Sequence, residues 1–406
     1  MIDTIRLART NRAFGALAAA RVVSLTGDAL SLVALVLLVA DRAGDAFAVA
    51  LLLLAGDFAP ALLGPLTGAL SDRFDLRRVM VAAELAQGGL VLAIALTLPP
   101  LPVLLVLVGL RAVAGQVFLP ASRAAVPALV ADRDLPAANA LLGFGANAGE
   151  VLGPLLAAAL VGVIGVPGVL LVDAASFGLS ALVLLAAPSL RPAPADGGLL
   201  GSARDGLRFM WSHKAVRVVA LGFCAVVACN GVDDVALVFL AHDTFGAGDA
   251  AVALILAAVG IGLLAGYALL GAGSRRVSMP VLLVAGFAVS SAGNLLTGLA
   301  WAVAAAFGVQ AVRGLGIAAM DVATNTLLPR LVPAAMLGRV FGNLYGAIGV
   351  AAALSYVGGS VLLDLTSAPV TLVVAGGLGL VATAATAFGL KGRAGPEVAK
   401  GRHPAA

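Results

Sequence analysis

The sequence is built mainly from apolar runs, each long enough to cross a lipid bilayer as a helix. A helix that spans a hydrocarbon core of about 30 Å needs about 20 residues. The chain has 406 residues, of which 61% are hydrophobic and 11% charged, and its mean hydropathy is +1.09. Runs of this kind predict an all-α integral membrane protein. Twelve spans are predicted, at residues 14–40, 46–70, 79–98, 101–126, 138–164, 167–188, 215–240, 249–272, 277–298, 302–328, 339–364 and 368–390.

The predicted spans divide evenly around one polar segment, residues 189–214. This linker begins with prolines and glycines that break helices, and its end is typical of an amphipathic helix at the cytoplasmic surface. The predicted organisation is therefore a six-helix bundle at 1–188, the linker, a second six-helix bundle at 215–391 and a cytoplasmic tail at 392–406.

A repeat supports the division into two halves. Arg111 and the segment 127–130 recur as Arg313 and the segment 329–332, each 202 residues later. Parallel repeats of this kind predict two pseudo-symmetric bundles with a substrate site between them, near the bilayer midplane.

Positive charge gathers on one side of the predicted spans and indicates their orientation, because short cytoplasmic loops retain Lys and Arg. With the N-terminus inside, the opposite side has one cation, Arg42. The strong preference for arginine over lysine indicates a GC-rich bacterial genome. The sequence thus predicts a multi-pass protein of the bacterial inner membrane with both termini in the cytoplasm.

The densest charge lies between the second and third predicted spans, in GALSDRFDLRR at residues 68–78. This pattern resembles the loop signature between helices 2 and 3 of the major facilitator superfamily. The corresponding residues are Gly68, Asp72, Arg73, Asp75, Arg77 and Arg78. The resemblance implies that Asp72 and Arg73 form a charge relay that latches the two bundles, while the paired arginines face lipid headgroups. The alternative interpretation is a plain positive-inside anchor.

A narrower resemblance points to an exporter branch of the superfamily. Asp75 stands where the commonest form of the loop signature has glycine. The resulting pattern resembles the drug/proton antiporter-like branch that includes enterobactin exporters and macrolide efflux proteins. Further segments that resemble it are NRAFGALAAARVVSLTGDAL, PALVADRDLPAANAL, VDAASF, DGLRFMW and LGRVFG. This resemblance covers most of the chain and implies export.

The fifth predicted span contains GEVLGP, which resembles the GxxxGP antiporter signature. Its motif residues are Gly149, Gly153 and Pro154. The resemblance implies an exporter, and the proline predicts a kink. Glycines four residues apart also serve ordinary packing between membrane helices, so helix packing is the alternative interpretation.

Ionisable residues inside predicted spans are candidate functional groups, because a charge at a helix centre costs about 2.5–3.5 kcal/mol. In the major facilitator fold, helices 1, 4, 7 and 10 line the central cavity, and each of these predicted spans carries charge. The candidates for proton coupling and the substrate cavity are Asp28, Arg111, Glu150, Asp233, Asp234, Arg313, Asp321 and Asn325. Asp57, Glu84 and Asp173 are secondary candidates, because helices 2, 3 and 6 are more peripheral in that fold.

Arg111 lies in LVGLRAVAG, which resembles the superfamily's helix 4 signature, where the arginine is implicated in proton movement. Because an arginine stays protonated, its expected role is to bias the titration of a nearby carboxylate, either Asp28 or Glu150. The alternatives are a packing hydrogen bond for Asp28 and contact with another helix for Glu150.

Two further polar pairs lie in the second half. The adjacent Asp233 and Asp234 point about 100° apart on a helix, so they cannot share one partner and only one is expected to be coupled. Asp321 and Asn325 share a face of the tenth span. They are expected either to contact substrate or to form a structural pair with the eleventh span.

The remaining motifs narrow the function class. The sequence has no GxxxxGK[ST] loop for ATP and no basic patch for nucleic acid, and His213, His242 and His403 form no metal cluster. The leading hypothesis is a monomeric transporter that uses the proton gradient and no cofactor. It would export amphipathic small molecules such as drugs, secondary metabolites or siderophores by alternating access. The alternatives are proton-symport uptake, lipid transport on the same fold, and a polytopic membrane enzyme.

Overall fold

A computed structural model of the chain describes residues 2–43, 48, 51–52, 54–56, 63, 66–67, 69–70, 73–190, 199–247, 249–273 and 277–391. Every regular element within these ranges is a helix, and they contain no strand. The predicted all-α fold is therefore confirmed. Most of the second predicted span, 46–70, lies outside the described residues.

The first half contains five α-helices and one short 3-10 turn among its described residues. They are α1 (Ile2–Thr10), α2 (Arg12–Ala43), α4 (Leu76–Thr97), α5 (Leu101–Leu129), η1 (Asp132–Asp134) and α6 (Leu135–Leu185). Gly165 divides α6 into two arms, because its backbone has a φ of 68° and a ψ of 172°. A positive φ is easily adopted only by glycine. The two arms correspond to the predicted spans 138–164 and 167–188.

The amphipathic helix α7 (Leu199–Ser212) and the helices of the second half complete the described fold. These helices are α8 (Lys214–Asn230), α9 (Asp233–Phe239), the π turn η2 (Leu240–Thr244), α10 (Asp249–Gly273), α11 (Met279–Gly298), α12 (Val303–Leu331), η4 (Ala334–Met336), α13 (Leu337–Leu365) and α14 (Ala368–Lys391). Ten segments of the described chain are long and apolar enough to cross a membrane, which is consistent with the twelve predicted spans.

The chain forms two compact units. The first comprises Met1–Leu207 and Ala334–Gly346, and the second comprises Arg208–Pro333 and Ala347–Ala406. The start of α13 belongs to the first unit because it packs on α7, where the Asn343 side-chain amide donates to the Ala203 carbonyl at 3.3 Å.

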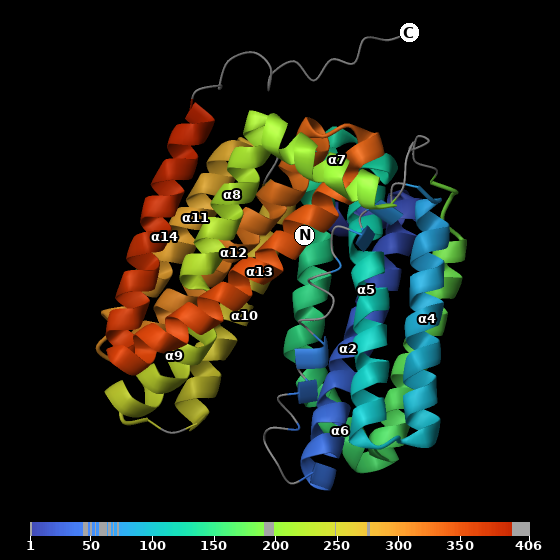
Figure 1. The fold of residues 1–406 in the computed structure, drawn as a ribbon, viewed down its shortest axis with the longest axis horizontal. Helices are drawn as coiled ribbons and strands as arrows, with labels where there is room; N and C mark the ends of the chain where they lie inside the picture. The colour runs from blue at the N-terminus through green and yellow to red at the C-terminus, as the bar shows by residue number, and fades with distance from the viewer. Residues whose placement is uncertain are drawn as a thin grey trace. The chain divides into compact units, whose positions relative to one another are not determined.

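Within the first unit, α2 packs along α6, and α4 packs against both α5 and α6 (Figure 1). An apolar core of this unit includes Leu30, Leu52, Ile94, Leu170 and Phe177, all at most 5% exposed. These contacts hold the intramembrane polar groups of α2, α4, α5 and α6 close to one another.

Glycines set the helix spacing in the second unit. A Cβ atom at Gly262 of α10 would overlap the backbone of α12 at Ala311, and one at Gly286 of α11 would overlap α12 at Gly316. Lipid tails are as apolar as leucine, so membrane helices associate through close packing of small residues rather than through the hydrophobic effect. The glycine content of these helices therefore has a direct structural role.

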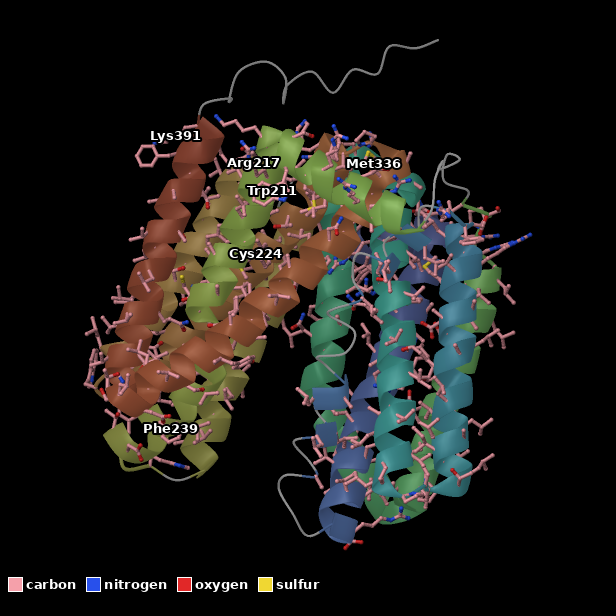
Figure 2. All side chains as sticks on the ribbon, in the orientation of Figure 1. Trp211, Arg217, Cys224, Phe239, Met336 and Lys391 are labelled. Carbon is pink, nitrogen blue, oxygen red and sulfur yellow. The ribbon has the colours of Figure 1, made fainter. Side chains whose placement is uncertain are left out.

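The two ends of the second unit differ in charge. Figure 2 shows Arg217 and Lys391 at one end of this unit and Phe239 at the other. Lys391 also lies over the Phe388 ring, 5.6 Å from its centroid.

Candidate functional site

The first unit contains an ion pair between two of its helices. A guanidinium nitrogen of Arg111, on α5, lies 2.7 Å from a carboxylate oxygen of Asp28, on α2. The same nitrogen lies 3.8 Å from Asp173, on α6. The side chain of Asp28 is 28% exposed and that of Arg111 16%, whereas that of Asp173 is fully buried. Arg111 therefore lies between an accessible and an inaccessible carboxylate.

Asp173 is held by hydroxyl groups as well as by Arg111. The hydroxyl of Ser31, on α2, hydrogen bonds one of its oxygens, and that of Ser176 donates to the other at 3.3 Å. The close approach of α2 and α6 requires Gly27, because a Cβ atom there would overlap both Asp173 and Ser176. Gly27 thus lets the carboxylate of α6 reach the ion pair.

Glu84 of α4 belongs to the same group of polar residues. Its side chain is 0% exposed, and Asp28 and Asp173 both act on it electrostatically. The sequence ranked Glu84 and Asp173 below the other candidates because helices 3 and 6 are peripheral in the family fold. The structure places Asp173 3.8 Å from the Arg111 guanidinium and Glu84 within electrostatic reach of Asp28 and Asp173.

Two polar stripes are the signal in the sequence that would have indicated this site. Residues three, four or seven positions apart share one face of a helix, and small polar residues in membrane helices gather where helices touch. The members are Ser24, Gly27, Asp28 and Ser31 on α2, and Asp173, Ser176 and Ser180 on α6.

The second unit repeats the ion pair on matching helices. Arg313 of α12 pairs with Asp233 of α9, and each side chain is only 7% exposed. A guanidinium nitrogen of Arg313 also donates to the side-chain oxygen of Gln310 at 3.3 Å, and the side-chain nitrogen of Gln310 donates to the Thr297 hydroxyl at 3.1 Å. Arg313 lies 202 residues after Arg111, so the two halves share an arrangement as well as a sequence pattern.

The helix that carries Asp233 is interrupted just before it. α8 ends at Asn230 and α9 begins at Asp233. The side chain of Asn294 donates to the Asn230 carbonyl at 3.3 Å and to its side-chain oxygen at 3.0 Å. This satisfies polar groups that the interruption would otherwise leave unpaired in the membrane. Discontinuous helices of this kind are typical of substrate and ion sites in transporters.

Asp321 and Asn325 lie on one face of α12, as their spacing predicts. The Asn325 amide donates to the Asp321 carboxylate at 2.7 Å, and the Tyr267 hydroxyl of α10 donates to the same carboxylate at 3.2 Å. Tyr267 lies in the eighth predicted span, whereas the sequence suggested the eleventh span or a substrate as the partner of this pair.

The loop before α4 is described from Arg73 onward. Asp75 caps α4 by accepting a hydrogen bond from the Arg78 amide at 3.1 Å, and the Ser189 hydroxyl donates to its other oxygen. Partial burial alone would raise the pKa of Asp75. The bonds from Ser189 and Arg78 and the charges of Arg77 and Arg78 outweigh burial, so the pKa lies below its usual value.

Arg77 caps a helix rather than pointing only toward lipid. Its guanidinium donates to the Ala187 carbonyl at 3.1 Å and to the Leu185 carbonyl at 3.4 Å, at the C-terminal end of α6. Cations are favourable there because the last carbonyls of a helix carry partial negative charge. Arg78 is exposed and is free to face headgroups, as predicted for both arginines.

Several predicted residues cannot be placed. Gly68, Asp72 and the secondary candidate Asp57 lie outside the described residues. Gly149, Glu150, Gly153 and Pro154 lie in α6 and Asp234 lies in α9, but their side chains are outside the described part of the structure. The non-helical backbone within α6 is at Gly165, eleven residues beyond the proline predicted to kink it.

A sequence profile of the Major Facilitator Superfamily matches residues 17–307. The chain belongs to this superfamily. The MFS-type transporter YfiS of Bacillus subtilis (strain 168) is 25% identical over 399 residues, which cover 95% of each chain. Macrolide efflux protein A of Streptococcus pyogenes is 32% identical over 121 residues, which cover 29% of this chain and 30% of that protein. The predicted membership of the superfamily is confirmed, and the similarity to a macrolide efflux protein extends over 29% of the chain.

Solved structures show the same fold. The human organic anion transporter MFSD10 aligns with a TM-score of 0.77 at 19% identity, covering 92% of this chain and 99% of that one. A bacterial homologue of the iron transporter ferroportin aligns with a TM-score of 0.76 at 19% identity, covering 93% and 99%. The chain is therefore a multi-pass membrane transporter with the major facilitator fold.

Proposed function

We propose that this transporter is a proton-driven exporter of amphipathic small molecules in the bacterial inner membrane. It works as a monomer by alternating access, with both termini in the cytoplasm. The observation that carries the proposal is the site at Arg111, where one guanidinium lies between an accessible carboxylate, Asp28, and a buried one, Asp173. The similarity to macrolide efflux protein A supports the direction of transport.

The proposed mechanism is competition between a proton and the cargo. Arg111 stays protonated and stabilises whichever carboxylate is ionised. A proton that enters from outside neutralises the site and favours release of the cargo, and loss of that proton to the cytoplasm restores the charge.

The test uses everted membrane vesicles that contain the full chain. Radiolabelled erythromycin and the dye ethidium serve as probes, and uptake is measured with and without an imposed proton gradient. The wild type should accumulate at least one probe only when the lumen is acidic. Asp28→Asn and Arg111→Ala should lose this dependence on the gradient, whereas Asp364→Asn, at an exposed position on α13, should retain it.

Each alternative gives a different result. If Asp28→Asn and Arg111→Ala both transport at the wild-type rate, the assignment of the coupling site is wrong. Gradient-driven movement of the probes in the opposite direction would indicate that the protein is an uptake transporter rather than an exporter. Recovery of a probe in a chemically changed form would indicate an enzyme.

A further inference from the structure

The first unit contains more acids than its ion pair can neutralise. The side chains of Asp28, Glu84, Arg111 and Asp173 form what we call the acid cluster, with three carboxyl groups and one guanidinium. Glu84 and Asp173 are fully buried. A charged side chain in the middle of the bilayer is costly unless it is paired, so all three acids cannot be ionised together at low cost.

Glu84 has the least support for a negative charge. The hydroxyls of Ser24 and Ser180 lie near its carboxyl group. Neither carboxyl oxygen of Glu84, however, has a hydrogen-bond partner within the usual limits of distance and angle. The described residues bring no cation within ion-pair distance of it, and its charged neighbours are the carboxyl groups of Asp28 and Asp173. A neutral acid avoids both the desolvation cost and this repulsion.

Asp173 is placed to gain and lose a proton. Its carboxyl group accepts hydrogen bonds from serine hydroxyls, and a hydroxyl group can also accept from a protonated acid. Its distance to the Arg111 nitrogen is 3.8 Å, against 2.7 Å for Asp28. Arg111 therefore interacts more strongly with Asp28 than with Asp173 in this structure.

The ion pair of the second unit joins one acid to one cation, and the acid Asp321 lies two turns further along α12 with Asn325 and Tyr267. Arg313 pairs with Asp233 and receives further support from the neutral Gln310. One cation and one anion balance each other, so a proton added there would break an ion pair. A proton added to the acid cluster would instead remove an excess negative charge.

We propose that Glu84 and Asp173 form the proton-storing part of the coupling site, behind the pair of Asp28 and Arg111. Glu84 keeps its proton throughout the cycle. Asp173 exchanges the transported proton, and only its O–H bond is made and broken. When Asp173 loses the proton, Arg111 shifts toward it and weakens its hold on Asp28, the accessible acid. This inference rests on the proposed proton-driven function.

The groups that face the cluster come from every helix packed around it. They are Ser24, Asp28 and Ser31 of α2, Glu84 of α4, Arg111 of α5, and Asp173, Ser176 and Ser180 of α6. Arg111 is the cation of this set. Its ability to pair with one carboxylate closely and a second more distantly is what allows Asp173 to respond to pH while Asp28 stays ionised.

The test is infrared spectroscopy of the purified full-length protein in lipid, because protonated carboxylic acids have their own carbonyl band. The wild type should show one band that persists from acid to alkaline pH and one that disappears as the pH rises. Glu84→Gln should remove the first band and Asp173→Asn the second. Asp364→Asn, a matched change at an exposed site, should retain both.

Carbon-13 labelling supplies a measurement that needs no folded variant. Labelling the glutamate carboxyl groups of the wild type should shift the persistent band, and labelling aspartate should shift the pH-dependent one. The proposal is wrong if the spectrum of Glu84→Gln retains every wild-type band, or if aspartate labelling does not shift the pH-dependent band. The spectra need neither cargo nor gradient, so failure of proton-driven export with these bands intact would overturn the proposed function alone.

Discussion

Asp233→Asn should destabilise the protein far more than Asp28→Asn, although both remove the acid of an arginine pair. Arg313 is only 7% exposed, so loss of Asp233 leaves a buried charge beside the neutral Gln310. Breaking a buried pair in this way costs about 3–5 kcal/mol. Arg111 is 16% exposed and keeps Asp173 at 3.8 Å when Asp28 is removed. We therefore expect a cost of about 1 kcal/mol there, near the range of exposed pairs.

Thermal unfolding in detergent measures the difference. Both tryptophans, Trp211 and Trp301, lie in the second unit, so their fluorescence reports on the unit that contains Asp233. Circular dichroism follows the helices of the whole chain and reports on both variants. At about 2–4 °C per kcal/mol for a domain of this size, Asp233→Asn should lower the melting temperature by about 6–20 °C and Asp28→Asn by about 2–4 °C.

A double variant separates two contributions to the loss of stability: the lost attraction between Asp233 and Arg313, and the cost of an unpaired buried charge on Arg313. Asp233→Leu combined with Arg313→Met removes both charges, and replacement of a buried pair by apolar residues is often neutral or stabilising. It should recover most of the stability that Asp233→Asn loses. The reasoning is refuted if Asp28→Asn is as destabilising as Asp233→Asn, or if the double variant is less stable than the single one.

Three further predictions concern packing and capping. Gly376→Ala in α14 should lower the melting temperature by several degrees because its Cβ would overlap the backbone of α11, while Gly377→Ala, which meets nothing within 4 Å, should not. Gly27→Ala should reduce gradient-driven transport of the ethidium probe by forcing Asp173 away from α2, and Gly178→Ala on α6, with open space around it, is its control. Asp75→Ala should cost about 1 kcal/mol at pH 7 as a lost helix cap. Because the folded-state pKa of Asp75 is lowered, its contribution is present above a pH of about 4 and is lost as pH falls further, so wild type and variant should converge in acid.

The helices and the halves could be predicted because their signals are local or periodic. The lengths of the apolar runs predicted the two arms of α6, and the break at Gly165 falls between them. The repeat of Arg111 as Arg313 predicted two related bundles, and both arginines form carboxylate pairs. Asp28 was one of the two carboxylates expected to partner Arg111, the other being Glu150, and the structure pairs Arg111 with Asp28.

The position of Asp173 could not be predicted from apolar length or from helix number. Its contact with Ser31 joins residues 142 positions apart and depends on how α2 and α6 are rotated about their axes. Twelve hydrophobic runs do not encode that rotation. Small and polar residues do encode it in part, because Gly27 permits an approach that any larger side chain would prevent.

The two units differ in the balance of acids and cations at their ion pairs, and this difference suggests different roles for them in a proton-driven transport cycle. A balanced pair such as Asp233 and Arg313 can take up a proton only if its ion pair breaks. Breaking a buried ion pair costs about 3 kcal/mol or more. This is close to the whole energy available from a proton gradient, which is about 2.3 kcal/mol per 100 mV. An acid cluster with surplus carboxyl groups takes up a proton and loses repulsion instead. Under the proposed function, the first unit is therefore suited to bind and release the proton at each turnover, and the second unit to keep its pair intact while it holds the broken helix at Asn230 and Asp233 in place for the cargo.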